Sequence, residues 1–347
     1  MQCVSSTSIS IDPSLTLVGR SRAGDGTTFW IPSLEIIVDC GALPKGCEGK
    51  QPALILMTHT HSDHVTWLTR YTHIRSNTST KKKVLSIYMP HRAVSFVDDY
   101  LAAYGKMITM DTTTDNSDDE KNQSDVSNSR ESYQLVGLEP HQTFELTIKG
   151  THLHITAIEC VHRVDCLGYS IWQQRQILKD DYRSLAGQKI GQLRKQGVEI
   201  TTTTLKPLLC YLGDTTAEVF LKHPEILQQH TKIVVECTYL DGESYEQAQQ
   251  HQHMHWDDLK KVVDQHPHIL FILIHFSVKY SASYIRDFFN TAANVHRNVH
   301  PMLVQQEIED DWNRARQQSN EDELGQTSGP PLCNCVLCSS KKENTVC

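Results

Sequence analysis

Three histidines and one aspartate stand within six consecutive residues, 59–64, which read His-Thr-His-Ser-Asp-His. Imidazole and carboxylate groups at such close spacing are typical metal ligands. His59 and His61 are two positions apart, so both side chains can point the same way from an extended segment. Asp63 and His64 come on the following turn and can face a second point nearby. The segment therefore predicts a site for two metal ions, with a histidine-rich surface loop as the plainer alternative.

The apolar run that directly precedes this cluster predicts a buried strand, so the cluster is expected where a strand ends. Further along the chain, strand-like and helix-like segments alternate. Strands are expected at 34–39, 53–58, 84–89, 143–148, 152–160, 167–172, 208–213, 232–237 and 269–275. Helices are expected at 91–106, 217–222, 243–250, 256–265 and 281–292. This mixture of hairpins and crossovers predicts an α/β fold, a four-layer αβ/βα sandwich.

The pattern H-x-H-x-D-H resembles the first motif of the metallo-β-lactamase superfamily, and three later segments narrow the resemblance. Val161-His162 stands before Cys166-Leu167-Gly168-Tyr169, and Gly213-Asp214-Thr215 follows an apolar run. Residues 275–280, His-Phe-Ser-Val-Lys-Tyr, look like the H-F-S-x-R-Y segment of ribonuclease Z, the tRNA 3′-processing endonuclease. Over residues 15–305 the chain therefore resembles the short form of ribonuclease Z.

The resemblance implies a site with two zinc ions. The implied ligands form two groups and a bridge: His59, His61 and His162; Asp63, His64 and His275; and Asp214 between them. Zinc favours imidazole and carboxylate ligands, and catalytic zinc sites keep a coordination position for water. Two such ions can acidify the attacking water and stabilise the charge of phosphodiester cleavage. Manganese and iron remain alternatives to zinc.

The resemblance also implies a general acid apart from the metal ligands. His255, in the run His-Gln-His-Met-His at 251–255, matches the histidine that protonates the leaving 3′-oxygen, and Glu236 matches the acid that orients it. A carboxylate beside an imidazole fixes the tautomer and favours the cation. The register of the run also allows His253 in place of His255. Asp63 is expected to act as general base in addition to its role as a ligand.

Contacts with substrate phosphate are expected from Ser277, Lys279 and Tyr280. The family usually has arginine where this chain has Lys279, and lysine cannot form the bidentate fork. Trp67 stands where the family has glycine, and it either narrows the nucleotide pocket or stacks a base. Residues 173–199, where relatives carry a flexible arm, lack Gly-Pro but are rich in lysine and arginine. A basic arm that binds phosphates and a solvated helical surface both remain open.

The net charge of −8 is concentrated in two segments. Residues 112–132 hold six acidic and two basic residues and almost no apolar ones, which predicts a disordered insertion. Residues 305–327 hold seven acidic and two basic residues. The remainder is near neutral, which removes an objection to an RNA substrate. We expect a catalytic domain over 1–305 and a flexible tail over 306–347, where Cys333, Cys335, Cys338 and Cys347 either bind zinc or lie in disordered chain.

The chain has eleven cysteines, and its first 19 residues contain no lysine or arginine. Without the basic start of a secretion signal, we expect reduced thiols and a cytoplasmic or nuclear protein, with organellar targeting as an alternative. No apolar run approaches the ~20 residues of a membrane span, so no membrane association is expected.

The sequence thus favours a zinc-dependent endoribonuclease that removes 3′ trailers from precursor tRNA. The resemblance also implies a homodimer. One alternative is another hydrolase of the fold, a glyoxalase II-like thioesterase or a cyclic-nucleotide phosphodiesterase. A second is a non-catalytic zinc-binding protein. Residues 275–280 and the expected pair of Glu236 and His255 favour the nuclease, and the presence of all seven ligand positions argues against a non-catalytic protein.

Overall fold

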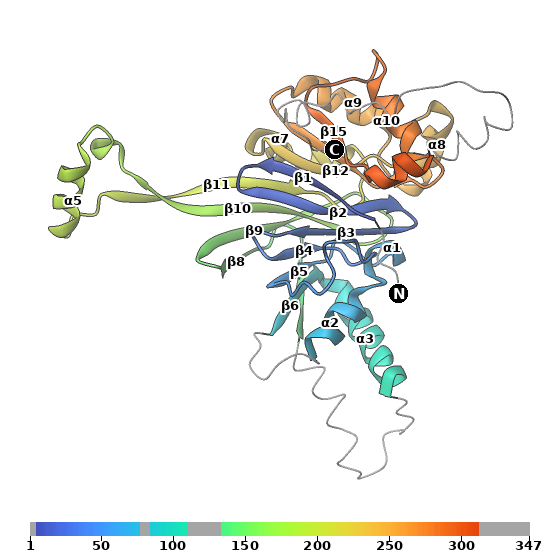
Figure 1. Cartoon of the computed structure of the whole chain (residues 1–347), viewed down its shortest axis with the longest axis horizontal. Helices are drawn as coiled ribbons and strands as arrows, with labels where there is room; N and C mark the ends of the chain where they lie inside the picture. The colour runs from blue at the N-terminus through green and yellow to red at the C-terminus, as the bar shows by residue number, and fades with distance from the viewer. Residues whose placement is uncertain (1–4, 77–83, 110–132, 312–347) are drawn as a thin grey trace, which may run out of the picture.

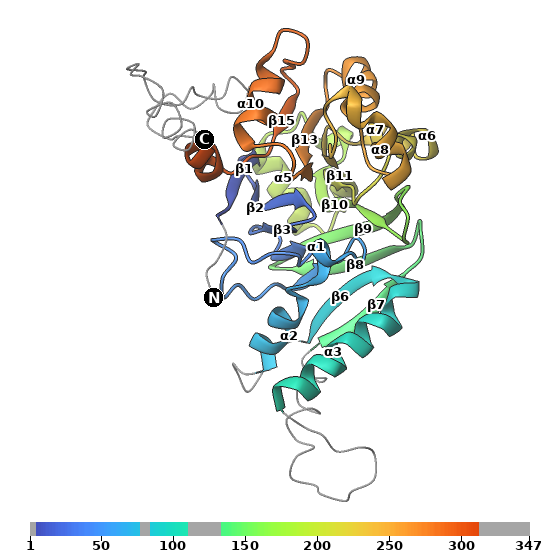
Figure 2. The same cartoon turned by 90° about the vertical axis from the view of Figure 1, so that its right-hand side faces the viewer.

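The computed structural model describes residues 5–76, 84–109 and 133–311, and its framework is two mixed β-sheets that face each other (Figures 1 and 2). The first sheet contains β1 (Thr7–Asp12), β2 (Leu15–Ala23), β3 (Gly26–Ile31), β4 (Ile36–Val38), β5 (Leu54–Leu56), β6 (Leu85–Pro90), β7 (Tyr133–Leu138) and β14 (Phe276–Ser277). Strands β1 to β7 lie side by side in chain order, and β14 pairs with the end of β2.

The second sheet contains β8 (Thr143–Ile148), β9 (Thr151–Glu159), β10 (Leu167–Leu178), β11 (Thr201–Tyr211), β12 (Lys232–Glu236), β13 (Leu270–Ile274) and β15 (Val299–Pro301). Its strand order is β15-β13-β12-β11-β10-β9-β8. Each sheet has an antiparallel and a parallel part. Strands β4 to β7 are parallel neighbours in the first sheet, as are β11, β12, β13 and β15 in the second.

Helices cover the outer face of each sheet, as Figure 2 shows. Those on the first sheet are α2 (Leu68–Ser76) and α3 (Val94–Thr109), and α1 (Ser62–Val65) is a single turn after β5. The second sheet is covered by α6 (Glu218–Lys222), α7 (Glu225–Gln229), α8 (Tyr245–His251), α9 (Trp256–Gln265) and α10 (Ala282–Asn290). Helix, sheet, sheet and helix are therefore the four layers that the sequence predicted, and the expected αβ/βα fold is confirmed.

Successive side chains of the central strands point to opposite faces of the sheet, and both faces are buried, which explains the apolar runs in their sequences. On β5, Leu54 and Leu56 face the core between the sheets, whereas Ile55 packs under the outer helices. On β12, Val234 belongs to the core between the sheets and Val235 packs beneath the helices of the other side. Because both faces of these strands are buried, the positions between their ends are apolar.

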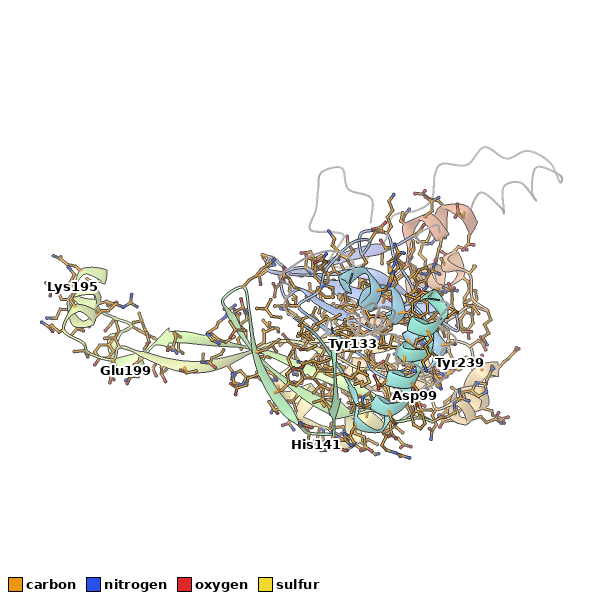
Figure 3. The ribbon with its side chains drawn as sticks, turned by 90° about the horizontal axis from the view of Figure 1, so that it is seen from below. Asp99, Tyr133, His141, Lys195, Glu199 and Tyr239 are labelled. Atoms are coloured by element: carbon orange, nitrogen blue, oxygen red, sulfur yellow. The ribbon has the colours of Figure 1, made fainter. Side chains whose placement is uncertain are left out.

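Strands β10 and β11 continue beyond their sheet as a two-stranded ribbon. Strand β9 pairs with β10 only as far as Gln173, but the β10–β11 ladder runs on to the pair Leu178 and Thr201. Helix α5 (Gly187–Lys195) lies at the far end, and the whole projection stands away from the two sheets (Figures 1 and 3). We call residues 174–205 the arm. Of the two alternatives for this region, the structure has a projecting arm that carries one solvated helix.

All nine predicted strands are present, and β1, β2, β3, β7, β14 and β15 are additional in the described residues. The predicted insertion 112–132 lies outside the described residues. So does the tail from residue 312 onward, including Cys333, Cys335, Cys338 and Cys347. Residues 305–311 are helical, and Ile308 is buried there. Among the helices in the described ranges, none combines the length and the apolar character that crossing a membrane requires.

Candidate metal centre

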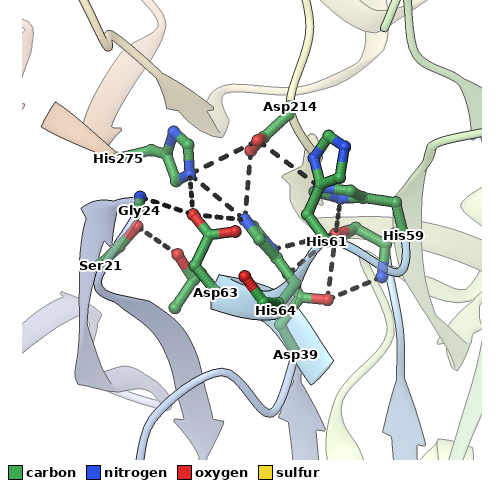
Figure 4. A network of polar contacts seen from close by, with 12 residues as sticks. Ser21, Gly24, Asp39, His59, His61, Asp63, His64, Asp214 and His275 are labelled. Atoms are coloured by element: carbon green, nitrogen blue, oxygen red, sulfur yellow. Dashed lines mark hydrogen bonds and ion pairs between the residues drawn. The ribbon is translucent and has the colours of Figure 1, made fainter. Parts of the chain in front are cut away.

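The carboxyl ends of the parallel strands of both sheets meet at one edge, which is where ligands bind in sheets of this kind. His59 follows β5, Asp214 follows β11, and His275 follows β13. His162 lies in the loop between β9 and β10, while Asp63 lies in α1. Figure 4 shows His59, Asp63 and His275, from segments far apart in the sequence, gathered around Asp214.

The first group comprises His59, His61, His162 and Asp214, whose nearest nitrogen and oxygen atoms all lie within 4.8 Å of one another. His61 Nδ1 is 3.0 Å from His59 Nε2 and 3.2 Å from His162 Nε2. Asp214 Oδ2 is 3.6 Å from His59 Nε2. These four groups thus converge on a single point.

The second group comprises Asp63, His64 and His275. His275 Nε2 is 3.2 Å from His64 Nε2 and 3.4 Å from Asp63 Oδ2. Asp214 also reaches this group, with Oδ1 3.5 Å from His64 Nε2 and Oδ2 3.4 Å from His275 Nε2. The structure therefore brings together all seven residues that the resemblance implied, in two groups that share Asp214.

Both groups fit a divalent metal. For tetrahedral bonds of about 2.0–2.1 Å, neighbouring ligand atoms lie about 3.3 Å apart. The atoms above are spaced by 3.0–3.6 Å and are nitrogens and carboxylate oxygens. The site is thus a candidate divalent-metal centre in both its donor chemistry and its spacing.

A buried carboxylate, Asp39, supports ligands of both groups. It follows β4 and accepts hydrogen bonds from Thr58 N at 2.7 Å and from His64 Nδ1 at 2.9 Å. The Thr58 hydroxyl donates to Asp39 and lies 3.0 Å from His59 Nδ1. Because Nδ1 of each ring faces an acceptor, Nε2 of His59 and of His64 is the nitrogen that points toward the cluster and can coordinate a metal. Sequence inspection did not single out Asp39 or Thr58.

A second buried carboxylate, Glu236, lies at the end of β12. Its Oε1 accepts from Thr215 N at 2.7 Å and from His253 Nδ1 at 2.9 Å. Its Oε2 accepts from Met254 N at 3.0 Å and from the Thr238 hydroxyl. One more set of possible ligand atoms lies within 4.8 Å of one another, and it comes from Glu236, His253, Asp214 and His275. We interpret them as a hydrogen-bond network, because both oxygens of Glu236 are already occupied by donors.

The predicted pairing of Glu236 with His255 is wrong in register by two residues. The structure pairs Glu236 with His253, whose ring lies 4.9 Å from that of His162 and 5.4 Å from that of His275. His255 is instead the N-cap of α9. Its Nδ1 accepts from Asp257 N at 3.1 Å, and its Nε2 donates to the carbonyl oxygen of Asp241 at 2.8 Å.

Where α8 ends decides which histidine of the run faces Glu236. Gln252 adopts a left-handed conformation, with φ of 54°, and the chain turns there so that His253 points into the site. A non-glycine residue in this region is uncommon. Nothing in the sequence around Gln252 predicts where the helix ends.

The imidazoles divide into two electrostatic classes. Burial, and then the neighbouring rings, lower the pKa of His59 well below its ordinary value, and burial likewise lowers the pKa of His61 and His162. These rings are neutral and can coordinate. Burial opposes the charge of His64 and His253, but carboxylates prevail: Asp214 and Asp39 raise the pKa of His64 to about 9, and Glu236 does the same for His253. Metal binding at His64 would therefore release a proton.

Asp63 is held as a carboxylate. Burial alone would raise its pKa, but the hydrogen bond with His275 and the charges of His64 and His275 lower it below the ordinary range. The amide of Gly24 donates to Oδ2 at 2.7 Å. Gly41 lets the neighbouring loop approach closely, because a Cβ there would lie 1.7 Å from the carbonyl oxygen of Asp63.

The three residues expected to contact substrate differ in their surroundings. Tyr280 is buried, and its hydroxyl accepts from Leu240 N at 3.0 Å and donates to Asp241, so its expected place at the substrate surface is wrong. Lys279 is partly exposed, pairs with Asp241 at 3.3 Å, and lies 5.3 Å from the ring centre of Tyr239. The backbone carbonyl of Ser277 accepts from Arg22, while its side chain is half-buried.

Trp67 is half-buried and packs against the apolar cluster on the outer face of the first sheet. Its backbone N–H donates to the carbonyl oxygen of Cys40 at 2.7 Å, which ties the start of α2 to the loop after β4. Both expected roles of Trp67, narrowing the nucleotide pocket and stacking a base, stay predictions.

The chain is similar to known proteins both in overall structure and in sequence. No protein-family model matches the chain. In overall structure it is similar to the metallo-β-lactamase fold protein YhfI from Bacillus subtilis, with a TM-score of 0.49, 14% identity, and coverage of 82% of this chain and 95% of that one. The short form of human tRNase Z aligns with a TM-score of 0.42 and 15% identity, over 75% of this chain and 92% of that one.

Three relatives by sequence are named as enzymes of one kind. The tRNase Z TRZ1 of Arabidopsis thaliana is 27% identical over 271 residues, covering 78% of this chain and 88% of that protein. The chloroplastic tRNase Z TRZ2 of the same plant is 26% identical over 279 residues, covering 79% and 71%. A nuclear ribonuclease Z of Triticum aestivum is 27% identical over 186 residues, covering 53% and 90%. The predicted resemblance to ribonuclease Z is confirmed, since all three of these relatives of the chain are tRNase Z enzymes.

Proposed function

We propose that this chain is a metal-dependent endoribonuclease of the ribonuclease Z type, which hydrolyses precursor tRNA to release the 3′ trailer. The observation that carries the proposal is the pair of Glu236 and His253 beside the bridging Asp214. Metal groups of this kind serve many hydrolases of the fold, whereas a separate carboxylate–imidazole pair suits a reaction with a poor leaving group. The tRNase Z names of the relatives agree with this reading.

Two zinc ions would be held by the seven residues of the two groups: His59, His61, His162, Asp63, His64, His275 and the shared Asp214. Their spacing and donor atoms support the assignment. When bound, the metals would supply an acidified water as nucleophile and stabilise the negative charge that develops on the phosphate. Asp63, held as a carboxylate, orients the attacking water and accepts its proton.

His253 acts as the general acid. Its Nδ1–H is held by Glu236, which stabilises the imidazolium. Among the described residues, Nε2 of this ring has no hydrogen-bond partner, and the side chain is 11% exposed. A proton at Nε2 can therefore be delivered to the 3′-oxygen of the tRNA as the phosphodiester bond breaks.

The arm binds the RNA backbone in the proposed complex. Its cations Lys179 and Arg183 pair with acids of the arm itself, at 3.2 and 3.0 Å. Lys189, Arg194 and Lys195 on α5 are exposed, and no ion pair of the described residues involves them. Figure 3 shows Lys195 near the tip of the arm, well away from the two sheets. Three free cations at this distance suit the backbone of a folded tRNA.

A homodimer is the assembly we propose, with contact through α3. Phe96, Tyr100 and Met107 recur at helical spacing on this helix and are 72%, 40% and 61% exposed. Phe96 also lines an open hollow of about 800 Å³ beside the helix. A two-fold axis would place this stripe against its own copy and bury it. A monomer in light scattering at micromolar concentration would contradict this assembly.

We place the protein in the cytosol or nucleus. Six cysteines of the described residues are free and buried, as expected of reduced thiols. The relatives include a chloroplastic and a nuclear enzyme, so fluorescence microscopy of a tagged full chain is the direct test.

The function is tested by giving the zinc-loaded protein a 3′-extended precursor tRNA and, in parallel, a thioester and a cyclic nucleotide. We expect cleavage of the RNA to a tRNA with a 3′-hydroxyl and a trailer with a 5′-phosphate. Turnover of the thioester or the cyclic nucleotide without RNA cleavage would overturn the proposal in favour of the corresponding hydrolase.

A further inference from the structure

The hydroxyl of Thr238 lies between the general-acid pair and the metal groups. Thr238 is 2% exposed and stands two residues after Glu236, so both side chains leave the end of β12 on the same side. Its Oγ1 contacts Glu236 Oε2 and lies 3.0 Å from His275 Nδ1. His275 is beside it because β12 and β13 are parallel, with Glu236 in register with Ile274.

The donors and acceptors in this contact can be assigned. Two backbone N–H groups, of Thr215 and Met254, point at the two oxygens of Glu236, which is therefore an acceptor. A hydroxyl has one proton, and the carboxylate is a stronger acceptor than the carbonyl of His275, which lies 3.0 Å away. The Thr238 proton thus goes to Glu236, and a lone pair of Oγ1 faces His275 Nδ1.

It follows that His275 Nδ1 carries the ring proton. The other nitrogen, Nε2, is then the one that faces Asp63, His64 and Asp214, at 3.2–3.4 Å, and that can coordinate a metal. We propose that Thr238 is a positioning residue whose hydroxyl fixes His275 in the metal-binding tautomer by linking it to Glu236. One carboxylate then orients the proton donor His253 directly and the ligand His275 through Thr238. The inference rests on the proposed metal site and adds a residue that its ligand set does not include.

The other half of the site contains the same arrangement. There the hydroxyl of Thr58 donates to Asp39 and faces His59 Nδ1 at 3.0 Å. One proposed ligand in each metal group therefore faces a threonine hydroxyl that is bonded to a carboxylate. Thr58 does for His59 what we infer that Thr238 does for His275. Loss of such an outer partner typically costs 10–100-fold in metal affinity or activity.

Three substitutions separate the hydroxyl from the shape of the side chain. Thr238→Val removes the hydroxyl and keeps the branched form, whereas Thr238→Ser keeps the hydroxyl. Thr216→Val is the matched control, because Thr216 is buried and its hydroxyl has no hydrogen-bond partner among the described residues. The full-length variants are stripped of metal, checked by circular dichroism, and titrated with zinc against a chromogenic chelator.

We expect Thr238→Val to weaken the binding of one zinc ion by about 10–100-fold, and Thr238→Ser and Thr216→Val to bind as the unchanged protein does. Unchanged affinity in Thr238→Val would overturn the inference. So would equal losses in Thr238→Val and Thr238→Ser, since the methyl group would then be responsible.

A spectroscopic measurement decides the case if Thr238→Val does not fold. Nitrogen-15 NMR of the zinc-loaded, unchanged chain reports whether the Nδ1–H of His275 is held in a hydrogen bond. A downfield Nδ1–H resonance is expected, and a resonance without the shift of a hydrogen bond would overturn the inference. None of these measurements uses RNA. A protein with the expected zinc affinities but no RNA cleavage would refute the proposed function alone.

Discussion

Two buried carboxylate–imidazole pairs flank the metal centre, and their difference explains how one motif serves two tasks. Asp39 holds His64, and Glu236 holds His253, each through Nδ1 at 2.9 Å. The carboxylates are 0% and 1% exposed. The far nitrogen of His64, however, lies within 3.5 Å of His275 and Asp214, whereas that of His253 has no hydrogen-bond or ion-pair partner among the described residues. In the proposed mechanism, the same support thus serves a metal ligand in one half and a proton donor in the other.

The position of the ring, and not its partner, is what separates the two roles. His64 lies in α1 directly after the metal-binding loop, so its ring is enclosed by other ligands. His253 follows the left-handed turn at Gln252, which leaves the ring at the edge of the group. Variants of the two halves should therefore fail in different ways.

The largest effect is expected from His64→Ala. Its removal takes a ligand from the second metal group and leaves Asp39 without its imidazole partner. We expect loss of about one zinc ion per chain, and RNA cleavage reduced by at least about a thousandfold. Metal content by mass spectrometry and single-turnover cleavage are the measurements. Full zinc content in this variant would remove His64 from the ligand set.

His253→Ala should fail without losing metal. Without the general acid, we expect cleavage of precursor tRNA to fall by about 10²–10⁴-fold. The zinc content should stay that of the unchanged protein. Parallel loss of zinc and activity would make His253 a ligand and would erase the difference between the two halves.

The arm is predicted to affect the binding of precursor tRNA and not the hydrolysis step. We expect the triple variant Lys189→Ala, Arg194→Ala and Lys195→Ala to raise KM for precursor tRNA about tenfold or more at 0.15 M salt. The slope of log affinity against log salt should flatten by about two, because up to three phosphate contacts are lost. Hydrolysis of bis-p-nitrophenyl phosphate is the control and should be unaffected. An unaltered salt slope would show that RNA binds elsewhere.

Glu236→Gln should shift the pH dependence of cleavage. Burial opposes the charge on His253, and Glu236 overcomes it and raises the pKa of His253 to about 9. The acid must be protonated, so kcat/KM falls as pH rises through this pKa. Without the carboxylate the lowering by burial remains, and the alkaline limb should move to lower pH by about two units or more. A limb that stays in place would mean that another group titrates.

His255→Ala should produce the smallest effect on cleavage. Because His255 is a buried N-cap of α9 that also donates to the Asp241 carbonyl, we expect a loss of about 2–4 kcal/mol in the free energy of unfolding. Cleavage should be essentially unchanged when assayed below the melting temperature. A rate loss comparable with that of His253→Ala would restore His255 as the acid.

The metal groups could be predicted from sequence because their residues are tied to strand ends. The apolar run before His59, Gly213 before Asp214 and the run before His275 all place their ligands at the same sheet edge. The family motifs then identified the partners. The fold followed from the same alternation of strands and helices.

What could not be predicted depends on local backbone conformation and on contacts distant in the sequence. The choice between His253 and His255 turns on the conformation of Gln252. Thr58 and Thr238 act through one hydroxyl each, and their partners come from neighbouring strands. The first three strands escaped notice because serine, threonine and arginine interrupt their apolar pattern, although most of their residues are buried. Tyr280 was misjudged because packing and hydrogen bonds within the fold, and not ligand binding, occupy its side chain.

The separate roles of the two imidazoles are tested most directly with a precursor tRNA that carries a bridging 3′-sulfur at the cleavage site. A thiolate leaves without protonation, so the substrate does not need a general acid. We predict that His253→Ala cleaves this substrate at nearly the rate of the unchanged protein, while His64→Ala stays defective. An equal defect of His253→Ala on the sulfur and oxygen substrates would contradict it.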